Sequence, residues 1–62
     1  MLGENLKKAR EEKRLGIVQV AQEVGITHAA LSYFENGLKV PSVPTLVRLA
    51  EVLGKSIDEL VK

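Results

Sequence analysis

Helix-breaking residues divide this 62-residue sequence into five short pieces, and their spacing limits the fold more than any other feature. The breaks fall at Gly16, Gly25, Gly37, the pair Pro41 and Pro44, and Gly54. Within the pieces, apolar residues recur with the spacing of a helix that buries one face. No alternating run long enough for a β-strand is present. We therefore expect an all-α domain of five short helices.

Residues typical of helix ends lie at the expected boundaries. Thr27 and Ser42 can act as N-caps, because a side-chain hydroxyl accepts a hydrogen bond from a free backbone N–H of the first turn. The stretch "SIDEL" begins with a capping box formed by Ser56 and Glu59. Gly37 suits the left-handed residue that often follows a helix. These signals place the third helix at about residues 28–36 and mark the starts of the last two.

The composition excludes several classes of protein. With 45% hydrophobic and 27% charged residues, the chain is expected to be a single folded domain, residues 1–62. It contains no cysteine for a disulfide or thiolate metal site, and its single histidine excludes a site with two imidazoles, so we expect no cofactor and no metal. It lacks both a signal peptide and the ~20-residue apolar run of a membrane helix, which predicts a cytoplasmic protein without a membrane partner.

The residue types do not indicate an enzyme. No nucleophile has a base within evident reach, and so short a chain is not expected to form a catalytic cleft. The net charge of +1 argues weakly against a nucleic-acid binder that depends on charge alone, but a few well-placed cations are sufficient. We therefore expect a non-enzymatic protein, and the charge leaves nucleic-acid binding open.

The third helix has an unusual outward face. In the stretch "GITHAALSYFENG", residues 25–37, Ala29, Tyr33 and Asn36 point away from the apolar side, with Ser32 and His28 on the flank. A merely solvated face more often carries lysine and glutamate. A small, polar and uncharged face suggests a partner, which is either another protein or the major groove of DNA. In the groove, alanine can touch a thymine methyl group and the polar residues can reach base edges or phosphates.

Two charged residues fall on the inward faces of their helices. Arg10 shares its face with Leu2, Leu6 and Ala9, and Glu35 lies beside the inward residues of the third helix. Because an unpaired buried charge is unfavourable, we expect Arg10 and Glu35 to form one partly buried ion pair between the first and third helices. The alternative is that Arg10 extends its guanidinium to water.

The stretch "VAQEVGITHAALSYFENG", residues 20–37, resembles the helix-turn-helix domain of the phage repressor and Cro family. Ala21 matches the close contact between the two motif helices, Gly25 the turn, Leu31 the buried residue of the recognition helix, and "ENG" its end. The flanking stretches "LKKAREEKRLG" and "PSVPTLVRLAEVLGKSIDEL" resemble the family's first helix and its last two. Arg10 and Glu35 stand where these repressors carry an ion pair. The resemblance implies a compact five-helix, lambda-repressor-like bundle whose second and third helices form the motif.

The resemblance also implies roles for individual residues. It implies a transcriptional regulator that binds double-stranded DNA, with residues 28–36 as the recognition helix in the major groove. The residues implied to contact bases are His28, Ala29, Ser32 and Tyr33. The residues implied to contact the DNA backbone are Thr27, Asn36 and Lys39.

The sequence departs from the family at both motif helices. The second helix of the family usually begins with a serine or threonine cap followed by a glutamine that contacts phosphate, but here Gly16 and Ile17 occupy these positions. His28 and Ala29 replace the glutamine, arginine or serine common in relatives, which removes bidentate base contacts worth about 1–3 kcal/mol each. We therefore expect a softer discrimination between bases. The departures also favour an alternative, a protein-interaction module on the same fold that acts like an antitoxin or as the partner of another regulator, with DNA binding secondary.

We expect a homodimer, because the last two helices carry more apolar residues than the chain can cover. Ile57 and Leu60 are assigned to the core, and Val52 and Val61 to the interface. Symmetric pairing makes palindromic DNA sites natural.

Overall fold

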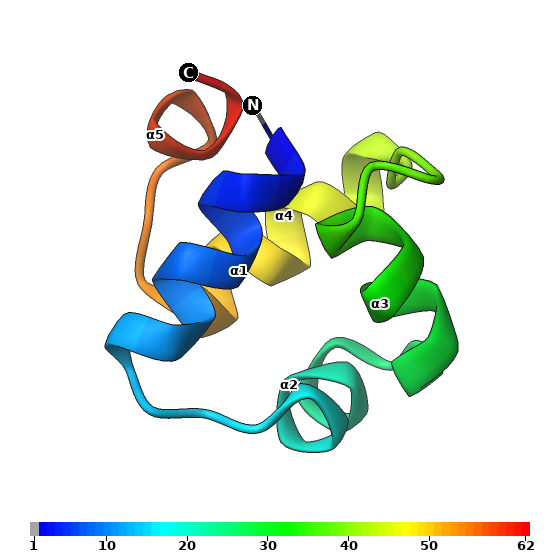
Figure 1. Ribbon diagram of the computed structural model, residues 1–62. Coiled ribbons are helices and arrows are strands. Elements are labelled where there is room, and N and C mark those ends of the chain that lie inside the picture. Colours follow the sequence, from blue (N-terminus) through cyan, green and yellow to red (C-terminus); the bar gives the residue numbers. More distant parts are fainter. Residues whose placement is uncertain (1) are drawn as a thin grey trace.

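The computed structural model describes residues 2–62, and its five helices lie where the sequence predicts them (Figure 1). The helices are α1 (Leu2–Glu12), α2 (Ile17–Val24), α3 (His28–Glu35), α4 (Val43–Leu53) and α5 (Ile57–Val61). The described residues contain no strand. Across this same range, every helix is too short or too polar to cross a membrane.

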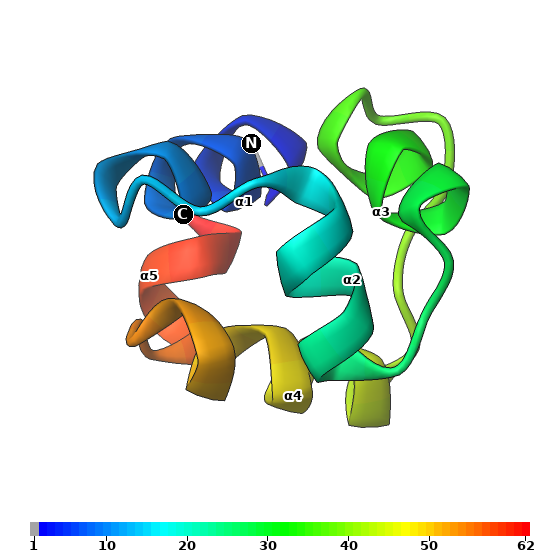
Figure 2. The same cartoon turned by 90° about the horizontal axis from the view of Figure 1, so that it is seen from below.

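The helices form one closed bundle. Figure 2 shows α1 and α4 on opposite sides, α5 closing one end, and α2 and α3 closing the other. The first half of α1 lies against α5, where the side-chain amide of Asn5 donates a hydrogen bond of 2.9 Å to the carbonyl of Leu60. The first and last helices are thereby joined although they are at opposite ends of the sequence.

Every helix contributes to the central core. The largest fully buried side chains are Leu6, Val20, Leu31, Leu49, Leu53 and Leu60. Buried alanines at positions 9, 21 and 50 allow the helices to approach closely. The assignment of Ile57 to the core is wrong, because its side chain is 38% exposed. Ile57 opens the short helix α5 and is rotated by about 60° from Leu60, at about 100° per residue, so it lies at the edge of the core.

The expected caps are present. The hydroxyl of Ser42 accepts a hydrogen bond of 3.3 Å from the N–H of Thr45 at the start of α4. At the start of α5, Ser56 and Glu59 form the reciprocal pair of a capping box, with bonds of 3.1 and 2.9 Å. Because these caps satisfy N–H groups that a helix leaves free, they explain why such short helices begin where they do.

Candidate nucleic-acid interface

A tight turn joins α2 to α3. Gly25 takes a left-handed conformation with a φ of +87°, which residues with a side chain rarely adopt. Its N–H and that of Ile26 both donate to the carbonyl of Ala21, at 2.9 and 3.0 Å. Thr27 then caps α3, since its Oγ1 accepts a hydrogen bond of 3.0 Å from the N–H of Ala30. The turn ends α2 and starts α3 within three residues.

Arg48 on α4 holds the end of α2 in place. Its Nη1 donates a hydrogen bond of 3.1 Å to the carbonyl of Val24, the last residue of α2. A guanidinium at this end is favourable, because the last carbonyls of a helix carry partial negative charge. The sequence analysis did not foresee this contact, which fixes the motif to the rest of the bundle.

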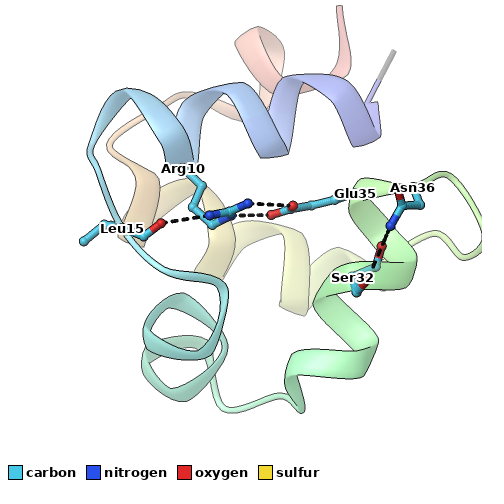
Figure 3. A network of polar contacts seen from close by, with 5 residues as sticks. All are labelled: Arg10, Leu15, Ser32, Glu35 and Asn36. Carbon is cyan, nitrogen blue, oxygen red and sulfur yellow. Dashed lines mark hydrogen bonds and ion pairs between the residues drawn. The ribbon is translucent and has the colours of Figure 1, made fainter.

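The ion pair expected between Arg10 and Glu35 is present and joins α1 to α3 (Figure 3). The Nε and Nη2 atoms of Arg10 lie 2.8 and 3.1 Å from the two carboxylate oxygens of Glu35. The side chains are only 14% and 5% exposed. The hydrogen bond to Glu35 raises the pKa of Arg10 above its ordinary value. Since Nη1 of Arg10 also donates to the carbonyl of Leu15 at 2.9 Å, one guanidinium ties together α1, α3 and the loop before α2.

The opposite face of α3 is open to solvent. His28, Ala29 and Tyr33 are exposed there, and Ser32 is half-buried. Figure 3 shows Ser32 and Asn36 on the side of α3 that faces away from the ion pair. Because Glu35 is turned inward, no carboxylate of α3 lies on this face. The face can therefore approach a polyanion without electrostatic repulsion from its own helix.

Lys39 lies beside this face although it follows α3 in the chain. The loop after α3 folds back, because the N–H groups of Leu38 and Lys39 both donate to the carbonyl of Tyr33, at 2.8 and 3.3 Å. The ammonium group of Lys39 is 5.5 Å from the centre of the Tyr33 ring, within the range of a cation–π contact. The structure thus brings a positive charge to the edge of the uncharged face.

The two residues expected at a dimer interface differ in exposure. Val52 on α4 is half-buried and packs against the core, whereas Val61 at the end of α5 is 51% exposed. Val61 is therefore the more accessible of the two.

The sequence analysis missed a group of exposed apolar residues that follow one another closely in the sequence. We name this group the loop patch, and it consists of Leu38, Val40, Val43 and Val47. Leu38 and Val40 are 71% and 81% exposed. The signal in the sequence was the run "LKVPSV", in which Leu38 and Val40 precede Pro41 in a loop and Val43 opens the next helix.

Comparison with known proteins identifies the same family along the whole chain. Residues 6–60 match the sequence profile of the helix-turn-helix family. The uncharacterized HTH-type transcriptional regulator YqaE of Bacillus subtilis is 39% identical over 62 residues. That alignment covers all of this chain and 53% of YqaE, so the chain spans about half the length of this relative.

Solved structures agree with this assignment. The regulator SinR of Bacillus subtilis, solved in complex with DNA, is 30% identical, with a TM-score of 0.92 and full coverage of both chains. SinR has also been solved in complex with the protein SinI. The DNA-binding domain of the P22 c2 repressor is 26% identical, with a TM-score of 0.95 over all of this chain and 82% of that one. The resemblance to phage repressors is confirmed, and the chain belongs to the helix-turn-helix family.

Proposed function

We propose that this chain is the sequence-specific DNA-binding domain of a transcriptional regulator, with α3 in the major groove of double-stranded DNA. The observation that carries the proposal is the exposed, uncharged face of α3 beside the cation of Lys39, with Glu35 held inside by Arg10. A helix enters the major groove with small and polar side chains toward the base edges and positive charges toward the phosphates.

Individual residues divide between the bases and the phosphates. The proposed base contacts are made by His28, Ala29, Ser32 and Tyr33, which lie on the outward face. Lys39 neutralises a phosphate at its edge, and Thr27 meets a phosphate together with the free N–H groups at the start of α3. Since none of these residues is arginine or glutamine, methyl contacts and single hydrogen bonds provide the discrimination.

The relatives support this function. SinR was solved on DNA, and the P22 c2 fragment is described as a DNA-binding domain. We extend that activity to this chain because it shares the fold of these domains over its whole length. A regulator of this kind works without catalysis in the compartment that holds the DNA, the cytoplasm of a bacterial cell.

Selection of bound duplexes from a random pool tests the proposal. We expect an enriched consensus, and an affinity for it that falls with salt by a slope near −0.9 in log K against log salt for each phosphate neutralised. An unselected duplex serves as the control and should bind more weakly at every salt concentration. A pool that shows no enrichment and no salt dependence contradicts the proposal.

The loop patch favours a second candidate, a protein-interaction module with DNA binding secondary. Its four apolar side chains are exposed in a short stretch, and exposed apolar groups that lie together often mark protein contacts. The SinR–SinI complex shows that a related regulator binds another protein. If protein binding is the main function, the random pool gives no consensus. Substitutions in the loop patch then weaken binding of the partner protein, whereas substitutions on α3 do not.

We also propose a homodimer through α4 and α5, with the accessible part of Val52 and Val61 at the contact. The matched test compares Val61→Asp with Val40→Asp, because both valines are exposed and only the first lies on α5. Sedimentation of the wild type is expected to show a dimer that Val61→Asp disrupts and Val40→Asp leaves intact. The reverse pattern assigns the contact to the loop patch, and a monomeric wild type on a palindromic duplex contradicts the dimer.

A further inference from the structure

Ser32 and Asn36 are joined by hydrogen bonds one turn apart on α3 (Figure 3). The Nδ2 atom of Asn36 lies 2.9 Å from the backbone carbonyl oxygen of Ser32 and 3.3 Å from its hydroxyl oxygen. A backbone carbonyl can only accept a hydrogen bond, so the amide group of Asn36 must present its NH2 side to Ser32. The one amide nitrogen therefore donates to both oxygens of Ser32.

This arrangement leaves the predicted backbone contact of Asn36 possible. An amide nitrogen carries two N–H groups, and the two oxygens of Ser32 lie on one residue, so an N–H can still be directed at a phosphate oxygen. The backbone contact that the family resemblance implies for Asn36 therefore stays a proposal.

The same arrangement determines the polarity of Ser32. A hydroxyl has one proton to donate, and it can accept at its oxygen. Because the oxygen of Ser32 accepts from Asn36, the proton remains for a partner outside the chain. Among the hydrogen bonds of residues 2–62, no bond donated by this hydroxyl is found.

We propose that Asn36 is a positioning residue that makes Ser32 a hydrogen-bond donor in the major groove, so that Ser32 selects a base edge that accepts. The inference rests on the proposed function, because it requires α3 to lie in the groove. The accepting groups there are purine N7, guanine O6 and thymine O4, whereas the amino groups of adenine and cytosine are donors. Ser32 thus favours guanine or thymine over cytosine at the position that it faces, and Asn36 sustains this preference through its bond to the Ser32 hydroxyl.

A double-mutant cycle on the enriched duplex tests this coupling. The proteins are the wild type, Ser32→Ala, Asn36→Ala and the double variant, each measured against duplexes altered at one base pair at a time. The readout is the ratio of two Kd values for one protein sample, which cancels any loss in the fraction of folded protein. We expect each single variant to lose about fivefold in discrimination at the same base pair, the size of one hydrogen bond, and the double variant to lose no more.

Two further variants sharpen the result. His28→Ala serves as the control and should change the preference at a different base pair, additively with Asn36→Ala. Asn36→Asp replaces the donating amide by a carboxylate, to which the Ser32 hydroxyl gives its proton, so the same discrimination should be lost. If Asn36→Ala weakens all duplexes equally, or if its effect adds to that of Ser32→Ala, the inference is overturned while the proposed function stands. If the wild type enriches no duplex, the proposed function itself fails.

Discussion

Substituting Glu35 by alanine leaves the guanidinium of Arg10 without its carboxylate in a place that solvent barely reaches. Two hydrogen bonds of 2.8 and 3.1 Å are lost, and only the bond from Arg10 to the carbonyl of Leu15 remains. Removing one partner of a fully buried pair costs about 3–5 kcal/mol. The 14% exposure of Arg10 and its surviving bond place Glu35→Ala at the lower end, about 3 kcal/mol.

Such a loss is large for this chain. A domain of this length has a free energy of unfolding of roughly 3–9 kcal/mol, at about 0.05–0.15 kcal/mol per residue. Each kcal/mol lowers the melting temperature of a small domain by about 4–8 °C, so we expect Glu35→Ala to melt about 12–24 °C below the wild type. Thermal unfolding followed by far-ultraviolet circular dichroism, which reports helix content, is the measurement.

A matched control separates the pair from a general effect of losing a glutamate. Glu51 lies on α4 with an exposed side chain, and Glu51→Ala should change the unfolding free energy by no more than about 0.5 kcal/mol. Replacing both partners, in Arg10→Met with Glu35→Leu, should recover much of the loss because no unpaired charge remains. A Glu35→Ala protein that melts within a few degrees of the wild type would show that the pair contributes little and would refute the reasoning.

Three other predictions concern separate parts of the molecule. The hydrogen bond from the backbone N–H of Ser56 lowers the pKa of Glu59. The stabilisation from this carboxylate is therefore complete above the ordinary pKa of glutamate and is lost as the pH falls through the lowered pKa. Urea unfolding across that pH range should show this dependence, and Glu59→Gln should remove it. Lys39→Ala should reduce the salt slope of DNA binding by about 0.9 for all sequences alike, and an unchanged slope would exclude a phosphate contact. Gly3→Ala should lower the melting temperature, because its Cβ would lie 2.6 Å from the backbone oxygen of Phe34; an unchanged or higher value would show that α1 can shift freely.

Local sequence signals were sufficient to predict the helices. The caps at Thr27, Ser42 and Ser56 involve residues only three positions away, so their partners are known before the chain is folded. The ion pair of Arg10 and Glu35 was also predictable, because two opposite charges on inward faces can each be satisfied by the other.

Features that depend on packing between distant segments were not predictable. Arg48 meets the end of α2 only once α4 has crossed it, and Gly3 is close to the backbone of α3 only in the folded bundle. The exposure of Leu38 could not be foreseen, since a loop has no periodicity that assigns its side chains to a face. The bond from Asn36 to Ser32 depends on a side-chain rotamer, which the sequence does not specify.

The inward anchoring of α3 has a consequence for how this domain can change over time. Leu31 and Glu35 secure the helix from within, and the outward side chains of His28 and Ala29 are exposed. Substitutions at outward positions should therefore alter which DNA is preferred while leaving the folded state almost equally stable. Under the proposed function, DNA preference and folding stability are separate properties of opposite sides of one eight-residue helix, so the domain can acquire new DNA sites by mutation without first acquiring extra stability.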